Sequence, residues 1–180
     1  MDSTTEQKRL LGDLIDFAVE EPAKADALLA EHPELLAGRW ILGETPLHFL
    51  AVESHPTGVR WFAEHGIDVN APNDFGDTAL LDAVSLQNLP MVELLLSLGA
   101  NPNIFPKMRD SALEMAVLAG SPLLVKTLLD AGAEVQSGGD PEHLAGALSM
   151  CSGNREEILA LLQRAAPEVE WTHLLVPEHR

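Results

Sequence analysis

A strict internal repeat restricts the fold of this sequence more than any other feature. Thr45, Thr78 and Ser111 recur at one fixed interval, and each is followed two positions later by a leucine. Three further columns keep the same register: Gly66, Gly99 and Gly132; Val59, Val92 and Val125; Phe62, Leu95 and Leu128. Because three units align without a gap, the pattern indicates a repeat architecture in which each unit buries its apolar face against its neighbours.

Each repeat predicts two short helices. Thr45 and its counterparts are N-cap residue types, and Pro46 suits the first helical position, where its missing N–H costs nothing. Apolar residues then follow at helical spacing: Leu47, Leu50 and Ala51 in the first clear unit. A second helix is predicted to end at Gly66, because a left-handed residue after a helix favours glycine. Each unit is therefore expected to run helix, turn, helix, long turn.

Two motifs carry a family resemblance. Thr45-Pro46-Leu47-His48 resembles the signature of ankyrin repeats, and residues 66–71, Gly-Ile-Asp-Val-Asn-Ala, resemble their second hallmark. Residues 94–103 and 128–135 are similar, so the clear resemblance covers residues 44 to about 136. It implies an all-α ankyrin-repeat solenoid of about five helix-turn-helix units, including diverged N- and C-terminal capping repeats.

The resemblance also predicts the organisation of the chain. We expect a single domain over residues 1–180, with a diverged N-terminal cap repeat at 1–43 and clear repeats at 44–76, 77–109 and 110–142. A diverged C-terminal cap repeat and tail occupy 143–180. Gly138-Gly139-Asp140 interrupts the regular turn before this last unit, and Trp171, Leu174 and Leu175 are predicted to cover the open end of the core.

The charge balance limits the partners. Lys and Arg number 11 against 28 Asp and Glu, a formal net charge of −17. Phosphate backbones and anionic membrane surfaces repel such a chain, so neither nucleic acid nor a membrane is an expected partner. A basic protein would be attracted at long range. The alternative interpretation is that the acidity only confers solubility.

The sequence does not predict catalysis. The seven histidines show no tight metal-ligand spacing, and Cys151, the only cysteine, has no partner for a disulfide or a CxxC motif. We therefore expect no enzyme activity, no cofactor and no metal. The polar N-terminus and the absence of a long apolar run predict a cytoplasmic protein, and we expect a monomer.

The resemblance implies where a partner would bind. In ankyrin repeats the long turns project as fingers, and the fingers and first helices line a concave surface. Carried onto this sequence, that surface is unusually apolar and is rimmed by acids, which is typical of an interaction site. The alternative is that these side chains pack onto neighbouring fingers. The predicted partner-binding residues are Trp40, Ile41, Leu42, Glu44, Glu53, Asp74, Phe75, Asp77, Leu86, Phe105, Lys107, Met108, Asp110 and Leu118.

Three functions remain open on the sequence alone. The first is a non-catalytic protein–protein interaction module that binds a partner on this finger and helix face. The second is an acidic inhibitor or immunity-type protein that blocks a basic toxin or nuclease. The third is a self-assembling structural element.

Overall fold

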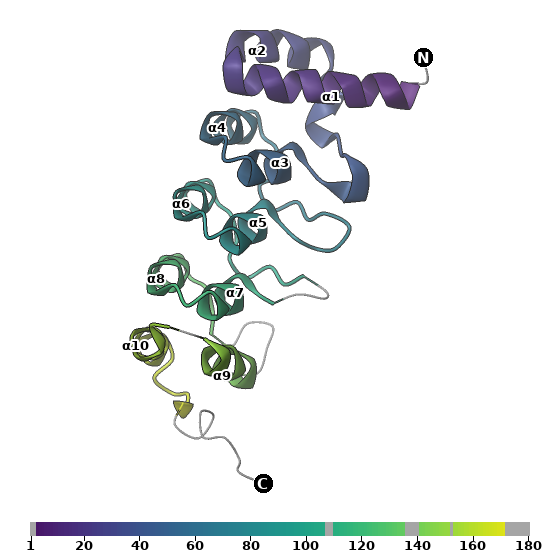
Figure 1. Ribbon diagram of the computed structural model, residues 1–180. Helices are drawn as coiled ribbons and strands as arrows, with labels where there is room; N and C mark the ends of the chain where they lie inside the picture. The colour runs from purple at the N-terminus through teal and green to yellow at the C-terminus, as the bar shows by residue number, and fades with distance from the viewer. Residues whose placement is uncertain (1–2, 107–109, 136–140, 152, 172–180) are drawn as a thin grey trace. The chain divides into compact units, whose positions relative to one another are not determined.

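The computed structural model describes residues 3–106, 110–135, 141–151 and 153–171. These residues form ten α-helices in five successive pairs, with two 3₁₀ helices after the first pair and no β-strand (Figure 1). The α-helices are α1 (Ser3–Glu20), α2 (Pro22–Glu31), α3 (Pro46–Val52), α4 (Pro56–Glu64), α5 (Ala79–Ser85), α6 (Leu89–Ser97), α7 (Ala112–Leu118), α8 (Pro122–Asp130), α9 (Pro141–Met150) and α10 (Arg155–Ala165). The 3₁₀ helices are η1 (Pro33–Ala37) and η2 (Ile41–Gly43).

The chain divides into two compact units. The first comprises Met1–Ala83 and Pro90–Ala100. Within it α1 packs on α2, α4 and η1, and α3 packs on α4. Its core is mostly aliphatic, with the buried aromatic side chains of Trp61 and Phe62, and the fully buried side chains include Leu14, Leu35, Leu47 and Leu50. The predicted apolar face of the first clear repeat is therefore the buried face.

The second unit comprises Val84–Leu89 and Asn101–Arg180. Here α7 packs on α8 and α9, and α10 packs on α8 and α9. Its buried side chains include Leu113, Val125, Leu128 and Ile158. Trp171 is 2% exposed, and its indole N–H donates to the Ala166 carbonyl at 3.4 Å. Trp171 therefore covers core as predicted, whereas Gly138-Gly139-Asp140, Leu174 and Leu175 lie outside the described residues.

The ends of the second helices close by the same hydrogen bonds in three repeats. After α4, the Gly66 N–H donates to the Ala63 carbonyl and the Ile67 N–H to the Phe62 carbonyl, both at 3.1 Å. Gly99 and Gly132 repeat this closure, which is the Schellman motif. Their φ angles of 86°, 93° and 88° lie in the left-handed region, and a Cβ at any of the three would meet nothing within 4 Å. Backbone conformation, not lack of space, therefore explains the glycine column.

The predicted N-caps are also present. At α7 the Glu114 N–H donates to the Ser111 hydroxyl at 3.1 Å, and the Ser111 N–H donates to the Glu114 carboxylate at 2.7 Å. This reciprocal arrangement is a capping box. At α5 the Leu81 N–H donates to the Thr78 hydroxyl at 3.4 Å. The hydroxyl column of the sequence thus satisfies backbone groups at helix starts.

A second left-handed column follows the first helix of each clear repeat. Ser54, Gln87 and Gly120 recur at the repeat interval and have φ angles of 61°, 53° and 65°. The Gln87 N–H donates to the Val84 carbonyl at 2.9 Å, and Gly120 makes the equivalent bond to Val117 at 2.9 Å. The sequence did not reveal this column because only one of its three members is glycine. Ser54 and Gln87 thus adopt a left-handed conformation, which costs roughly 1–2 kcal/mol for each residue that has a Cβ.

Replacing Gln87 with glycine should therefore stabilise the protein. We expect Gln87→Gly to raise the free energy of unfolding by about 1 kcal/mol, since the relief of strain exceeds the cost of the extra entropy of the unfolded chain. Gln87→Ala keeps the Cβ and should stay within about 0.5 kcal/mol of the wild type. Urea denaturation of both variants checks this, and equal stability of the glycine and alanine variants would contradict the explanation.

Candidate functional site

The first two long turns of the clear repeats share one hydrogen-bonded frame. The Trp40 N–H donates to the Glu44 carbonyl at 2.8 Å, and one repeat later the Asn73 N–H donates to the Asp77 carbonyl at 2.9 Å. In the second turn the Asn73 side-chain oxygen also accepts from the N–H groups of Phe75, at 2.9 Å, and Asp77, at 3.0 Å. We call residues 40–44 and 73–77 the first and second fingers. Each finger is a loop closed by a backbone hydrogen bond between its first and last residues.

The two fingers are bonded to each other. The Asp74 N–H donates to the Leu42 carbonyl at 2.9 Å, and the Arg39 guanidinium donates to the carbonyls of Gly43, at 2.9 Å, and Pro72, at 2.8 Å. Gly43 has φ 73°, and a Cβ there would lie 2.9 Å from the Asp74 backbone nitrogen. Glycine at this position therefore allows the fingers to approach closely, and the fingertips are held in a fixed relation.

His48 joins the second finger to α3. Its ring is 1% exposed, and Nε2 donates to the Asp77 carbonyl at 2.8 Å, so Nε2 carries the proton. Nδ1 then accepts from the Thr45 N–H at 3.2 Å and the Thr45 hydroxyl at 2.8 Å. Burial lowers the pKa of His48, because the charged ring would lose its hydration. A proton on Nδ1 would place two donors, Nδ1–H and the Thr45 N–H, against each other, so this site favours the neutral ring.

Large apolar side chains are exposed on this frame. Ile41 is 72% exposed, Leu42 50% and Phe75 54%, all on the two fingers, while Phe49 is 40% and Val52 46% exposed on α3. Phe49 and Val52 share a helix face at i, i+3 spacing, and the half-buried Trp40 ring meets Phe49 edge-on at 5.5 Å. We call Ile41, Leu42, Phe49, Val52 and Phe75 the finger patch. All five belong to the first unit.

Leu42 has a strained backbone as well as an exposed side chain. Its φ of 65° and ψ of 22° lie in the left-handed region, where glycine and asparagine are far more common than leucine. The side chain does not recover this cost by burial in the core. Leucine at a position whose conformation glycine or asparagine would adopt at lower cost is typical of a residue kept for binding.

The acidic rim differs in part from the prediction. Glu53 and Asp74 are exposed and Glu44 is half-buried, all near the finger patch in sequence. The prediction that Asp77 is an accessible residue of the rim is wrong, because Asp77 is only 4% exposed. Asp77 directly precedes the N-cap Thr78, and its carbonyl accepts bonds from His48 and Asn73, so it is part of the frame.

The remaining predicted residues lie in the second unit. Leu86 is 52% exposed, Phe105 and Leu118 are half-buried, and Asp110 is exposed. Lys107 and Met108 lie outside the described residues. Asp110 and Leu118 line a groove of about 440 Å³ whose other lining residues are Glu114, Glu142, His143, Gly146, Ala147 and Met150. The sequence prediction therefore included two members of this groove.

Sequence reasoning missed Phe49, Glu114 and Met150. Phe49 could have been found, because it stands three residues before Val52 on a helix whose buried apolar positions include Leu47, Leu50 and Ala51. Met150, which is 76% exposed, stands at the end of α9 in a repeat too diverged for the resemblance to place. No role was predicted for Glu114, whereas it caps α7 and also lines the groove.

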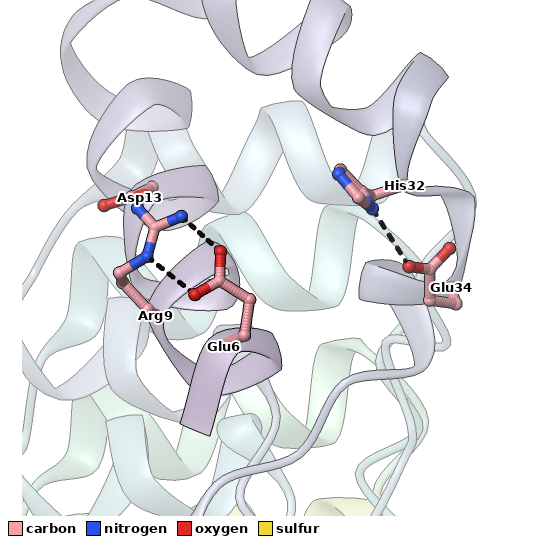
Figure 2. Close-up of polar contacts among 5 residues, drawn as sticks. All are labelled: Glu6, Arg9, Asp13, His32 and Glu34. Carbon is pink, nitrogen blue, oxygen red and sulfur yellow. Dashed lines mark hydrogen bonds and ion pairs between the residues drawn. The ribbon is translucent and has the colours of Figure 1, made fainter. Parts of the chain in front are cut away.

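Other polar clusters in the described ranges do not resemble a chemical site. Figure 2 shows Arg9 between Glu6 and Asp13 on α1, and His32 beside Glu34. The bond from Arg9 lowers the pKa of the exposed Glu6 carboxyl. The pKa of the Glu34 carboxyl is lowered by a hydrogen bond with its own backbone and, to a smaller extent, by a hydrogen bond with His32. Ion pairs this exposed contribute little to stability. Among the described residues, no group of three or more His, Cys, Asp or Glu could hold a metal ion.

No helix in the described part of the chain combines the length and the apolar character that crossing a bilayer demands.

Comparison with known proteins gives the class of the protein. The family described as "Ankyrin repeats (3 copies)" matches residues 13–106, just over half of the chain. The chain belongs to the ankyrin-repeat family, and the predicted all-α ankyrin fold is confirmed. Ankyrin repeats bind other proteins, and the family is generally non-catalytic.

Three relatives in this comparison are much longer proteins. The mouse "Ankyrin repeat and SOCS box protein 14" is 36% identical over 102 residues, 52% of this chain and 17% of that protein. The mouse "Ankyrin repeat domain-containing protein 13B" is 35% identical over 86 residues, 48% of this chain and 12% of that protein. The Caenorhabditis elegans "Intracellular phospholipase A2" is 30% identical over 153 residues, 78% of this chain and 14% of that protein. The chain thus spans less than a fifth of the length of these relatives.

The His48 frame predicts a pH-dependent stability. Because the folded-state pKa lies below the unfolded value of 6.5, the unfolded chain takes up the proton first, and the free energy of unfolding should fall as the pH drops below about 6.5. His48→Gln keeps hydrogen-bonding groups but has no proton to gain, so it should lose this part of the pH dependence. Urea denaturation between about pH 7.5 and pH 5 checks this. Identical slopes for wild type and variant would contradict it.

Proposed function

We propose that this chain is a non-catalytic interaction module that binds a partner protein through the finger patch. The observation that carries the proposal is the exposure of five large apolar side chains on a frame fixed by hydrogen bonds. A rigid apolar surface loses little conformational entropy on binding, which favours affinity. The residues are also chemically suited to a contact centre, since aromatic and aliphatic anchors dominate binding energy at protein interfaces.

Local packing explains the patch less well. The sequence left open that the fingertip side chains fold back onto neighbouring fingers. Trp40 packs in part against Phe49 of α3. Ile41, Leu42 and Phe75 nevertheless keep half or more of their surface exposed. Large apolar side chains exposed on one short frame favour a binding surface, because the hydration of apolar surface is unfavourable in free energy. These three residues therefore support partner contact over packing.

The charge of the chain favours a basic partner. Glu53 and Asp74 are exposed beside the patch in sequence, and the formal net charge is −17. We propose that the partner carries an apolar contact centre with Lys or Arg around it. This chain would then fit the role of an inhibitor of a basic toxin or nuclease. Its acidic surface would oppose the basic face of that target.

Variants of the patch test the proposal. A partner is first identified by cross-linking at low salt, and its purified form is titrated onto the full chain. We expect Leu42→Asn combined with Phe75→Ala to weaken binding by about 2 kcal/mol, roughly 30-fold in dissociation constant. The free energy of unfolding should be unchanged or higher by up to about 1 kcal/mol, because asparagine tolerates left-handed φ.

The control for this experiment is Leu123→Ala, which removes an apolar side chain that is 56% exposed on α8. It should leave the affinity within about twofold of the wild type. If the double variant binds as tightly as the control, the finger patch is not the contact surface. If the wild type instead forms a stable dimer that the double variant loses, the patch serves self-assembly and the proposal of a different partner is wrong.

Ionic strength tests the electrostatic part separately. If acids steer the partner, the association rate should fall at least about tenfold between about 0.05 M and about 0.5 M salt, while the dissociation rate changes little. Glu53→Gln should reduce the low-salt association rate more than Glu64→Gln, which removes an equal charge from α4. Stopped-flow measurement of the binding rates checks this. A rate independent of salt would rule out steering by charge.

A further inference from the structure

A groove in the second unit has features that the proposed function does not use. It has a volume of about 440 Å³ and lies between α7 and α9, two helices in direct contact. Leu118, Ala147 and Met150 supply apolar surface, and Met150 is 76% exposed. A Cβ at Gly146 in α9 would meet nothing within 4 Å, so this position has room for a larger side chain. The volume is in the range of sites that hold small ligands or single side chains.

Acids surround this apolar surface. Asp110, Glu114 and Glu142 all line the groove. Glu114 is held in place, because one carboxylate oxygen accepts from the Ser111 N–H at 2.7 Å and its side chain is only 13% exposed. The other oxygen lies 3.7 Å from His143 Nδ1, beyond hydrogen-bond distance, and the His143 side chain is 73% exposed. A carboxylate held at one oxygen by its own helix cap thus lines the groove, with His143 beside its other oxygen.

We propose that this groove binds an arginine or lysine side chain carried on an exposed segment of the partner protein. The inference rests on the proposed function and specifies the chemistry that a partner must bring. Both side chains have an apolar stem and a charged head, which match an apolar surface bordered by carboxylates. Arginine fits best, because its planar head donates to carboxylates in pairs and is less strongly hydrated than an ammonium group.

Short blocked peptides test the inference without the partner. The probes are Ac-Gly-Leu-Xaa-Leu-Gly-NH₂ with Xaa as arginine, lysine or citrulline, the last being a neutral replacement of nearly the same shape as arginine. They are titrated at low salt onto the full ¹⁵N-labelled chain. We expect the arginine peptide to shift amide signals of α7 and α9 with a dissociation constant on the order of 1 mM. The citrulline peptide should bind at least about fivefold more weakly.

Two variants and one matched control locate the binding. Gly146→Leu fills the groove without changing charge, and Glu114→Gln with Glu142→Gln removes two charges while glutamine can still cap α7. Each should weaken binding of the arginine peptide at least about fivefold. Glu156→Gln with Glu157→Gln removes two exposed charges from the first turn of α10 and should have no effect.

Several results would overturn the inference. Equal affinity for the arginine and citrulline peptides would show that the charge of the side chain does not contribute to binding. An equal loss of affinity in the Glu156→Gln, Glu157→Gln control would show only a general attraction to an acidic chain. Undiminished binding to Gly146→Leu would place the peptide elsewhere. A dimer of the chain that Gly146→Leu abolishes would make a second copy the occupant. None of these results bears on the finger patch, whose test uses different residues, so failure of this inference can be distinguished from failure of the proposed function.

Discussion

The structure depends on closing the ends of helices too short to be stable by themselves. The first helices α3, α5 and α7 have seven residues each, well below the dozen or so that an isolated helix needs in water. Each such helix leaves about as many backbone groups unpaired at its ends as it pairs inside. Hydroxyl and carboxylate caps at the starts, and left-handed residues at the ends, satisfy many of them. Burial of the apolar faces then supplies the stability that the helices lack alone.

The sequence predicted the fold wherever all three repeats meet a backbone requirement with the residue types that favour it. The glycine column at 66, 99 and 132 was readable because left-handed φ selects glycine, and the hydroxyl column because side-chain oxygens accept from free N–H groups. The column at 54, 87 and 120 was not readable, since serine and glutamine occupy two of its positions. Backbone strain therefore cannot be predicted from the sequence when the residue at the strained position is not of a type that favours left-handed φ.

The candidate site was predictable only in part, for a related reason. The resemblance placed Ile41, Leu42 and Phe75 on fingers, and the structure leaves all three exposed. It placed Asp77 on the surface as well, although its carbonyl is needed by His48, a bond between residues 29 positions apart. Phe49 was missed even though its spacing to Val52 places it off the buried face of α3. The burial of Asp77, in contrast, depends on a long-range contact, which a repeat pattern does not encode.

Strain at Leu42 connects the fold to the proposed function. Its neighbour Gly43 is also left-handed and must stay small, since a Cβ there would contact Asp74. The two fingers can approach closely only because the chain turns sharply at these two residues. Gly43 meets that demand at no steric cost, so the strain is confined to Leu42. Asparagine would lower the strain but would replace an exposed apolar side chain with a polar one. The conformation that joins the fingers is therefore the same one that presents leucine to solvent, and a more stable fingertip would be a poorer contact surface.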